Sequence, residues 1–257
     1  MLKIENTEVM GWEHAIRGMR NPMNSWDKSD SKHCSEVAYC DECTAMIVNS
    51  PCPLIGYDPV AIGPNDHTLM MNLAHGGPVH AKYRRMITVY LDITAPLYWW
   101  KEFDTYKVGT VANSCSTMHK IHAKEFELED FSTEHLLYDH DDEICPVEAG
   151  LYYEAAPRYS VFFSPVKLLE TTIKLLNSNR EAFLKTKDKK YWWQMIQLLP
   201  TSYNQKRTVM LNYEVLVNIY ESRRHHKLDE WHTFCDWIES LPYSELIIGE
   251  KELRADD

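Results

Sequence analysis

The sequence predicts an α+β fold that combines a mixed or antiparallel sheet with a C-terminal half rich in long helices. Residues 86–93, MITVYLDI, are apolar and include several β-branched residues, which is typical of a buried strand. From residue 165 onward apolar side chains recur at helical spacing, and Pro200 and Pro242 interrupt the pattern. Strand signals early in the chain and helix signals late in it together indicate the α+β class.

The expected elements follow in order along the chain. Residues 3–10 predict an edge strand and residues 12–19 a short helix. Residues 20–63 are rich in Asn, Asp, Ser, Pro and Cys, so we expect a long irregular insertion, which in a compact domain is usually functional or mobile. Asn65 and Asp66 are expected to cap a helix that ends near His75. Further helices are expected at 166–176, 180–187, 191–198, 206–223 and 227–240.

Composition places limits on the class of protein. With 257 residues, 44% hydrophobic and 25% charged, the chain is expected to form one globular domain over residues 1–257, with the insertion at about 20–63. The absence of a bilayer-length apolar run and of a signal-peptide pattern predicts a cytoplasmic protein with no membrane partner. A net charge of −11 argues against binding a nucleic acid polymer, whereas a small anionic ligand needs only a few local cations.

Seven cysteines without a secretion pattern suggest reduced thiols. The segment HCSEVAYCDECTAMIVNSPC holds Cys34, Cys40, Cys43 and Cys52, so tetrahedral zinc is sterically possible. A strong zinc pattern needs two well-spaced cysteine pairs, and only Cys40 and Cys43 form one. Ordinary loop thiols with no bound metal are the favoured interpretation, and structural zinc is the alternative.

The segment from Asp92 to His119, DITAPLYWWKEFDTYKVGTVANSCSTMH, carries the main functional signal. An apolar strand leads into an aromatic-rich helical segment, in which Trp99 and Trp100 are expected to fill the core. The chain then opens into small polar residues, and a hydrophobic platform feeding such a loop predicts a pocket for a polar, ring-shaped ligand. These polar residues are Thr110, Asn113, Ser114, Ser116 and Thr117.

Three separated blocks of this chain resemble the flavin-dependent thymidylate synthases. The first is NDHTLMMNLAHGGPVHAKYRRMITVYLDITAP, similar to the family's helix, glycine-histidine turn, strand and Ala-Pro. The second is YWWKEFDTYKVGTVANSCSTMH, at the place of the family's Arg-His-Arg signature. The third is LLPTSYNQKRTVMLNYEVLVNIYESRRHHKLDEW, similar to the family's Leu-Pro turn and long helix. Together they cover most of the chain.

The resemblance implies roles for particular residues. His80 falls on a flavin-contacting histidine, and cofactor binding is implied also for Lys107, Asn113, Asn212 and Asn218. Substrate binding is implied for Thr110, Ser114, Ser116 and Arg223, of which Ser116 and Arg223 would also serve catalysis. Arg17 and Arg20 add the hypothesis that the N-terminal segment supplies positive charge to the same pocket.

The chain departs from the family's signature at its charged positions. Thr105, Tyr106 and Lys107 stand in place of Arg-His-Arg, so one lysine replaces two arginines and an imidazole. Ser114 stands at the position of a glutamate, and Lys227 replaces a second flavin-contacting histidine.

The resemblance implies an FAD-dependent methyltransferase that reductively methylates, or otherwise modifies, C5 of deoxyuridylate. FAD would be the cofactor, NADPH and methylenetetrahydrofolate the co-substrates, a pyrimidine deoxynucleotide the substrate, and a homotetramer the assembly. The alternative is a catalytically altered or inactive relative that binds nucleotide on the same fold. An unrelated α+β protein with a coincidental block order is the third possibility.

Overall fold

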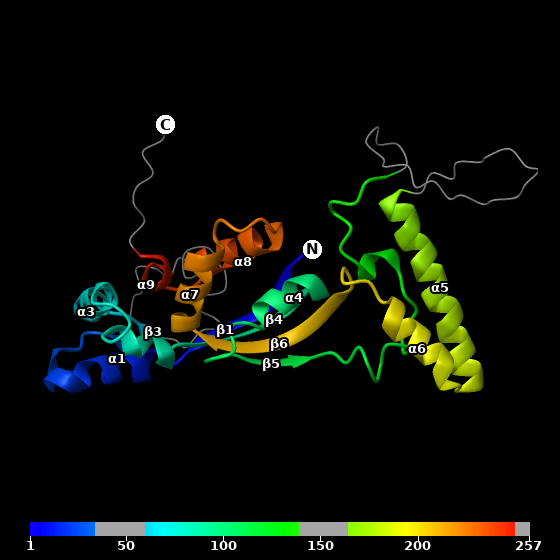
Figure 1. Cartoon of the computed structure of the whole chain (residues 1–257). Coiled ribbons are helices and arrows are strands. Elements are labelled where there is room, and N and C mark those ends of the chain that lie inside the picture. The colour runs from blue at the N-terminus through cyan, green and yellow to red at the C-terminus, as the bar shows by residue number, and fades with distance from the viewer. Residues whose placement is uncertain (34–59, 139–163, 250–257) are drawn as a thin grey trace, which may run out of the picture. The chain divides into compact units, whose positions relative to one another are not determined.

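The computed structural model describes residues 1–33, 60–138 and 164–249, coloured in Figure 1. Four strands form the main sheet in the order β1-β4-β6-β5. Their bounds are Lys3–Met10 for β1, Thr88–Pro96 for β4, Val111–Ser114 for β5 and Asn204–Asn212 for β6. β1 lies at an edge, as its sequence predicts. The α+β class with an antiparallel sheet is therefore confirmed.

Chain contacts divide the molecule into two compact units. The first comprises Met1, Thr94–Lys101 and Ser114–Lys206, and the second comprises Leu2–Ile93, Glu102–Asn113 and Arg207–Asp257. Among the described helices, none combines the length and the apolar character that crossing a bilayer requires.

In the first unit, α5 (Pro165–Thr186) packs against α6 (Lys189–Leu198). Ser164 begins α5 by accepting a hydrogen bond from the backbone N–H of Lys167, and Pro165 follows in the first turn, where a missing N–H costs nothing. The sequence predicts two helices here, at 166–176 and 180–187, but one continuous helix forms because no Gly or Pro interrupts residues 166–186. The core of the unit is a cluster of Ile121, Phe126, Phe131, Leu169, Ile173, Leu176 and Met195.

Trp99 and Trp100 are both buried in this unit, with rings 5.0 Å apart, and Trp100 donates its indole N–H to the carbonyl of Gln205. Both indoles therefore fill the interior, as predicted.

In the second unit, helices α1 (Trp12–Arg20), α3 (Pro64–His75) and α7 (Tyr213–Arg223) pack against the 3₁₀ turn η4 (Ala81–Met86). Helices α8 (Asp229–Glu239) and α9 (Glu245–Ile248) pack against α7 and against each other. α4 (Leu97–Phe103) ends in this unit. The predicted helix over 206–223 is wrong: residues up to Asn212 form strand β6, because Gln205, Val209 and Leu211 are buried at odd positions with the period of a strand. Only α7 is helical.

The predicted insertion is ordered where the structure describes it. Two 3₁₀ turns, η1 (Asn21–Met23) and η2 (Trp26–Lys28), lead to β2 (Lys32–His33), which pairs antiparallel with β3 (Val60–Ala61). Residues 34–59, and with them the four cysteines weighed as zinc ligands, lie outside the described residues.

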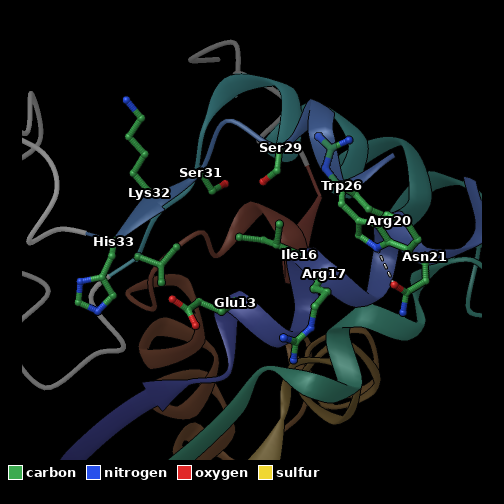
Figure 2. Close-up of a pocket in the computed structure, with 11 residues that line it drawn as sticks. Glu13, Ile16, Arg17, Arg20, Asn21, Trp26, Ser29, Ser31, Lys32 and His33 are labelled. Carbon is green, nitrogen blue, oxygen red and sulfur yellow. Dashed lines mark hydrogen bonds between the residues drawn. The ribbon is translucent and has the colours of Figure 1, made fainter. Parts of the chain in front are cut away.

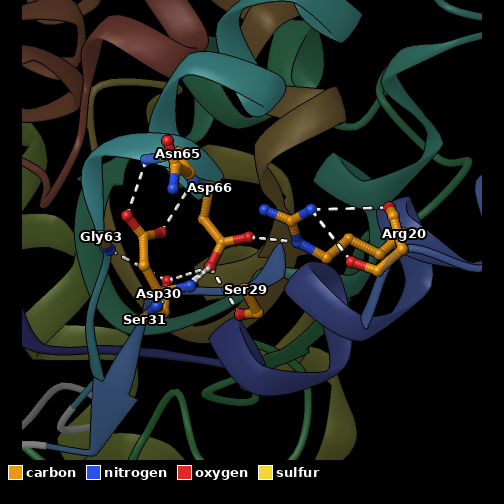
Figure 3. A network of polar contacts seen from close by, with 8 residues as sticks. Arg20, Ser29, Asp30, Ser31, Gly63, Asn65 and Asp66 are labelled. Atoms are coloured by element: carbon orange, nitrogen blue, oxygen red, sulfur yellow. Dashed lines mark hydrogen bonds and ion pairs between the residues drawn. The ribbon is translucent and has the colours of Figure 1, made fainter. Parts of the chain in front are cut away.

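Arg17 and Arg20 do not line the cavity that contains Thr110, contrary to the hypothesis that they supply charge to the same pocket. They border a separate cavity beside α1 (Figure 2), and only Arg17 is exposed. Arg20 is buried and donates from Nε to Oδ1 of Asp66 over 2.6 Å (Figure 3). The sequence suggested that Asp66 caps α3, but its side chain does not do so. The side chain of Asp30 accepts hydrogen bonds from the backbone N–H groups of Asn65 and Asp66 instead.

Candidate functional site

A cavity of about 320 Å³ lies in the second unit, where α4 ends and the chain turns into β5. Phe103, the last residue of α4, is buried and anchors this end of the cavity. Asp104 accepts a hydrogen bond of 2.6 Å from Nη1 of Arg207, so the guanidinium of this β6 residue balances the charge of Asp104. The remaining lining residues are Tyr106, Lys107, Thr110 and Ala112, of which Lys107 is an exposed cation.

The hydroxyl of Thr110 distinguishes this cavity. It is buried and has no hydrogen-bond partner among the residues that the structure describes. Leaving a polar atom buried without a hydrogen bond costs about 1–3 kcal/mol, so such atoms are rare in folded proteins and each one calls for an explanation. A polar atom of a ligand in the cavity would satisfy it.

At Gly109 the loop between α4 and β5, which lines the cavity, lies close to the start of α7. The φ of Gly109, 81°, is a left-handed conformation that a side chain disfavours. A Cβ atom there would lie 3.0 Å from both Nδ2 of Asn212 and Cγ2 of Val215. Asn212 is itself the N-cap of α7, because its Oδ1 accepts from the backbone N–H of Val215 over 3.0 Å. Glycine is therefore what allows the loop to approach this helix end.

Arg223, at the end of α7, is held by several contacts beside the cavity. Its Nε donates to the hydroxyl of Tyr106 over 2.9 Å, and its Nη1 donates to Oε2 of Glu102 over 2.8 Å. The guanidinium also lies 4.8 Å from the ring centre of Trp231. Glu102 Oε2 accepts a further hydrogen bond from the indole N–H of Trp231 and lies 3.3 Å from Nε2 of His226. Arg223 is thus partly neutralised and oriented before any ligand arrives.

The structure brings together four of the residues to which the resemblance assigns roles. Lys107 and Thr110 line the cavity. Asn212 borders the same loop at Gly109, and Arg223 contacts the lining residue Tyr106. These four belong to the second unit.

The other predicted residues are placed differently. His80, Asn113 and Asn218 are exposed, and none is among the described residues that line the cavity. Ser114 and Ser116 belong to the first unit, where both are exposed and Ser116 Oγ accepts a hydrogen bond from the backbone N–H of His119. The roles of these five residues, like those of the four brought together above, stay predictions.

Sequence reasoning missed Glu102, Asp104 and Trp231 as parts of this site. Each acts through a partner more than 100 positions away in the chain, such as Arg207 for Asp104, so no local pattern marks them. Within the described part of the chain, no group of three or more His, Cys, Asp and Glu side chains is arranged to hold a metal ion.

Fold and site together describe an α+β protein with a cavity of about 320 Å³ beside a helix-terminal arginine. Neither a family model nor a curated protein sequence matches the chain. Solved structures are similar to it in fold. The flavin-dependent thymidylate synthase ThyX from Helicobacter pylori, complexed with FAD and dUMP, is 15% identical with a TM-score of 0.57, over 96% of this chain and 98% of that one. The UMP/dUMP methylase PolB from Streptomyces cacaoi, bound to 5-Br dUMP, is 12% identical with a TM-score of 0.53, over 95% of this chain and 92% of that one.

These likenesses extend over nearly the whole length of each chain. The resemblance drawn from the sequence blocks is therefore confirmed at the level of the fold, which is that of the flavin-dependent thymidylate synthases.

Proposed function

We propose that this protein binds a pyrimidine deoxynucleotide in the cavity between α4 and β5 and, with FAD and a folate donor, methylates C5 of deoxyuridylate. One observation carries the proposal: Lys107 and Thr110, to which the resemblance assigns ligand contacts, line a single cavity of about 320 Å³. The solved structures of this fold hold dUMP in ThyX and 5-Br dUMP in PolB, which supports a pyrimidine nucleotide as the substrate class here.

The residues present suit a nucleotide. The resemblance assigns Lys107 a cofactor contact, but Lys107 lines the cavity itself and there offers a point charge for the nucleotide phosphate. The hydroxyl of Thr110, which has no partner among the described residues, can donate to a ligand oxygen. Arg223, fixed by Glu102 and Tyr106, offers a guanidinium that can stabilise negative charge on a uracil carbonyl while C5 acts as the nucleophile toward the carbon donor.

FAD, as a dinucleotide, needs more surface than this cavity gives. We propose that Asn212 and the exposed Asn218 and His80 contribute to its binding, with sites completed between chains of a homotetramer. When bound, the flavin supplies the reducing equivalents of the methylation.

Absorbance spectroscopy tests the proposal. We expect FAD titration to give a bound-flavin spectrum, and incubation with dUMP, methylenetetrahydrofolate, NADPH and FAD to give thymidylate by mass spectrometry. Lys107→Ala should weaken dUMP binding by roughly tenfold or more, since hydrogen bonds to charged groups contribute about 1.5–3 kcal/mol. Lys185→Ala, an exposed lysine of α5, is the control and should change nothing.

Two observations support a second candidate function. The family's Arg-His-Arg is replaced by Thr105, Tyr106 and Lys107, and Arg223 already pairs with Glu102. Binding of dUMP without flavin binding or turnover would favour a nucleotide-binding relative over an enzyme. If neither dUMP nor FAD bound, both versions would be rejected.

A further inference from the structure

A second and larger cavity, of about 500 Å³, lies beside α1 in the second unit (Figure 2). It shares no lining residue with the cavity at Thr110. Ligand pockets commonly have volumes of about 300–1,000 Å³, so this one is large enough for a small organic molecule. The function proposed above makes no use of it.

The walls of this cavity are held in place. Asp66 Oδ2 accepts hydrogen bonds from the hydroxyls of Ser29 and Ser31 and from the backbone N–H groups of Asp30 and Ser31 (Figure 3). Arg20 holds the other oxygen of the same carboxylate. The segment that forms one wall is therefore fixed to the start of α3, and a fixed wall lowers the entropy cost of binding.

An apolar surface is available for a flat ring. Trp26 is 51% exposed and supplies most of this surface, whereas Ile16 and Val60 line the cavity but are only 6% and 3% exposed. The indole N–H of Trp26 donates to Oδ1 of Asn21 over 2.8 Å, which fixes the orientation of the ring. A fixed and half-exposed indole can stack on an aromatic ligand at little entropic cost.

Two exposed cations border this surface. The ion pair with Asp66 balances Arg20, whereas Arg17 and Lys32 are exposed lining residues for which the described structure contains no ion pair. Glu13 is the one carboxylate among the described lining residues. In a chain with a net charge of −11, this local excess of cations favours an anionic ligand.

We propose that this cavity is a second binding site, which takes an anion carried on a planar aromatic ring. The ring packs against Trp26, Ile16 and Val60, and the anionic group pairs with Arg17, with Lys32 adding charge at the rim. A nucleoside phosphate and an aromatic amide that carries a carboxylate both combine a planar ring with an anionic group. The site is separate from the proposed nucleotide cavity and does not depend on the function assigned to it.

Isothermal titration calorimetry with two probes tests the proposal. Adenosine monophosphate carries the phosphate, and p-aminobenzoylglutamate carries the carboxylates; the tighter probe identifies the anion. Arg17→Ala and Trp26→Ala should each weaken the tighter probe by about tenfold, and Trp26→Phe should restore most of the loss because it keeps a flat ring. Glu13→Gln, which removes the opposing charge, should strengthen binding.

Lys28→Ala is the matched control, because Lys28 is an exposed cation of the same η2 turn as Trp26 but does not line the cavity. Thermal melting of each variant shows that it is folded. No binding of either probe at millimolar concentration overturns the proposal, and so does binding that is insensitive to Arg17 and Trp26. Binding that is lost in Lys107→Ala but kept in Arg17→Ala places the probe in the other cavity and also overturns it.

Discussion

Asp66 is an ionised carboxylate with no exposed surface. Burial alone would favour its neutral form, but hydrogen bonds from Ser31, Ser29 and Arg20 outweigh this effect and lower the pKa of Asp66 below its ordinary value of 3.8. A carboxyl group whose pKa is lowered by folding stabilises the native state where it is ionised. Its contribution is complete above the unfolded-state pKa and is lost as the pH falls through the lower, native value.

Asp66→Asn should therefore lower the free energy of unfolding at neutral pH by about 3–5 kcal/mol, because Arg20 would be left buried without its partner charge. Urea denaturation at several pH values measures this. The difference between wild type and variant should shrink as the pH falls below about 4. Glu181→Gln, on the exposed surface of α5, is the control and should follow the wild-type curve. A difference that does not change with pH would contradict the ionic role of Asp66.

Thr110 presents the opposite case, a buried hydroxyl without a partner in the described structure. Thr110→Val has nearly the same shape and removes the unsatisfied group, so it should stabilise the ligand-free protein by about 1 kcal/mol. The same change should weaken dUMP binding, because the ligand loses a hydrogen bond. Denaturant unfolding and calorimetry measure the two effects.

Thr208→Val provides the comparison, since the hydroxyl of Thr208 donates to Asp92 over 2.6 Å. This variant should lose stability and keep its affinity for dUMP. If Thr110→Val destabilised the protein by as much, the hydroxyl would have a structural partner and no ligand role.

At the scale of elements, Gly109 determines how the loop after α4 meets α7. Gly109→Ala adds both the strain of a left-handed backbone, about 1–2 kcal/mol, and a contact at 3.0 Å with Asn212 and Val215. Gly77 has a similar φ of 87°, but a Cβ there would meet nothing within 4 Å, so Gly77→Ala isolates the backbone strain. Gly109→Ala should be the less stable variant by chemical denaturation and should also lose dUMP affinity. Equal stability of the two variants would show that the loop can move away from α7.

The element over residues 204–223 shows what the sequence could and could not predict. Apolar residues at both strand and helix spacing allow one long helix, and the prediction overlooked Asn212 as the N-cap that separates strand β6 from α7. The edge strand, the helix α1 and the aromatic helix α4 were predictable because their patterns are local. The pairing of Arg223 with Glu102 was not, because 121 positions separate the two residues.

In the candidate site, too, features with a local sequence pattern could be predicted and long-range contacts could not. The polar loop that contains Thr110 could be predicted, since a change from apolar to small polar residues is visible in the chain itself. The orientation of Arg223 depends on Tyr106, Trp231 and Glu102, whose proximity arises only from the packing of α4 against α7 and α8. For this reason the resemblance supplied Arg223, and the structure supplied its partners.

At the scale of the whole molecule, the resemblance implies that several chains assemble into a homotetramer. The surface of α5 bears on this prediction. α5 buries Leu169, Ile173 and Leu176 in the core of the first unit. On another side of the same helix, Leu168 and Leu175 are 60% and 49% exposed and lie seven residues apart, so they project in nearly the same direction. Exposed leucines aligned along a long helix are typical of a surface that another helix covers.

The purified protein should therefore form an oligomer, with a tetramer expected, by size-exclusion chromatography with light scattering. The double variant Leu168→Glu and Leu175→Glu should give smaller species, because each charge would otherwise be buried at the interface without a partner. Its circular dichroism should remain that of the wild type, since neither side chain belongs to the buried cluster of its unit. Glu181→Lys, on α5 but away from the leucine stripe, should leave assembly intact. A wild-type monomer would exclude any site shared between chains, and the proposed flavin site would then have to be completed by this chain alone.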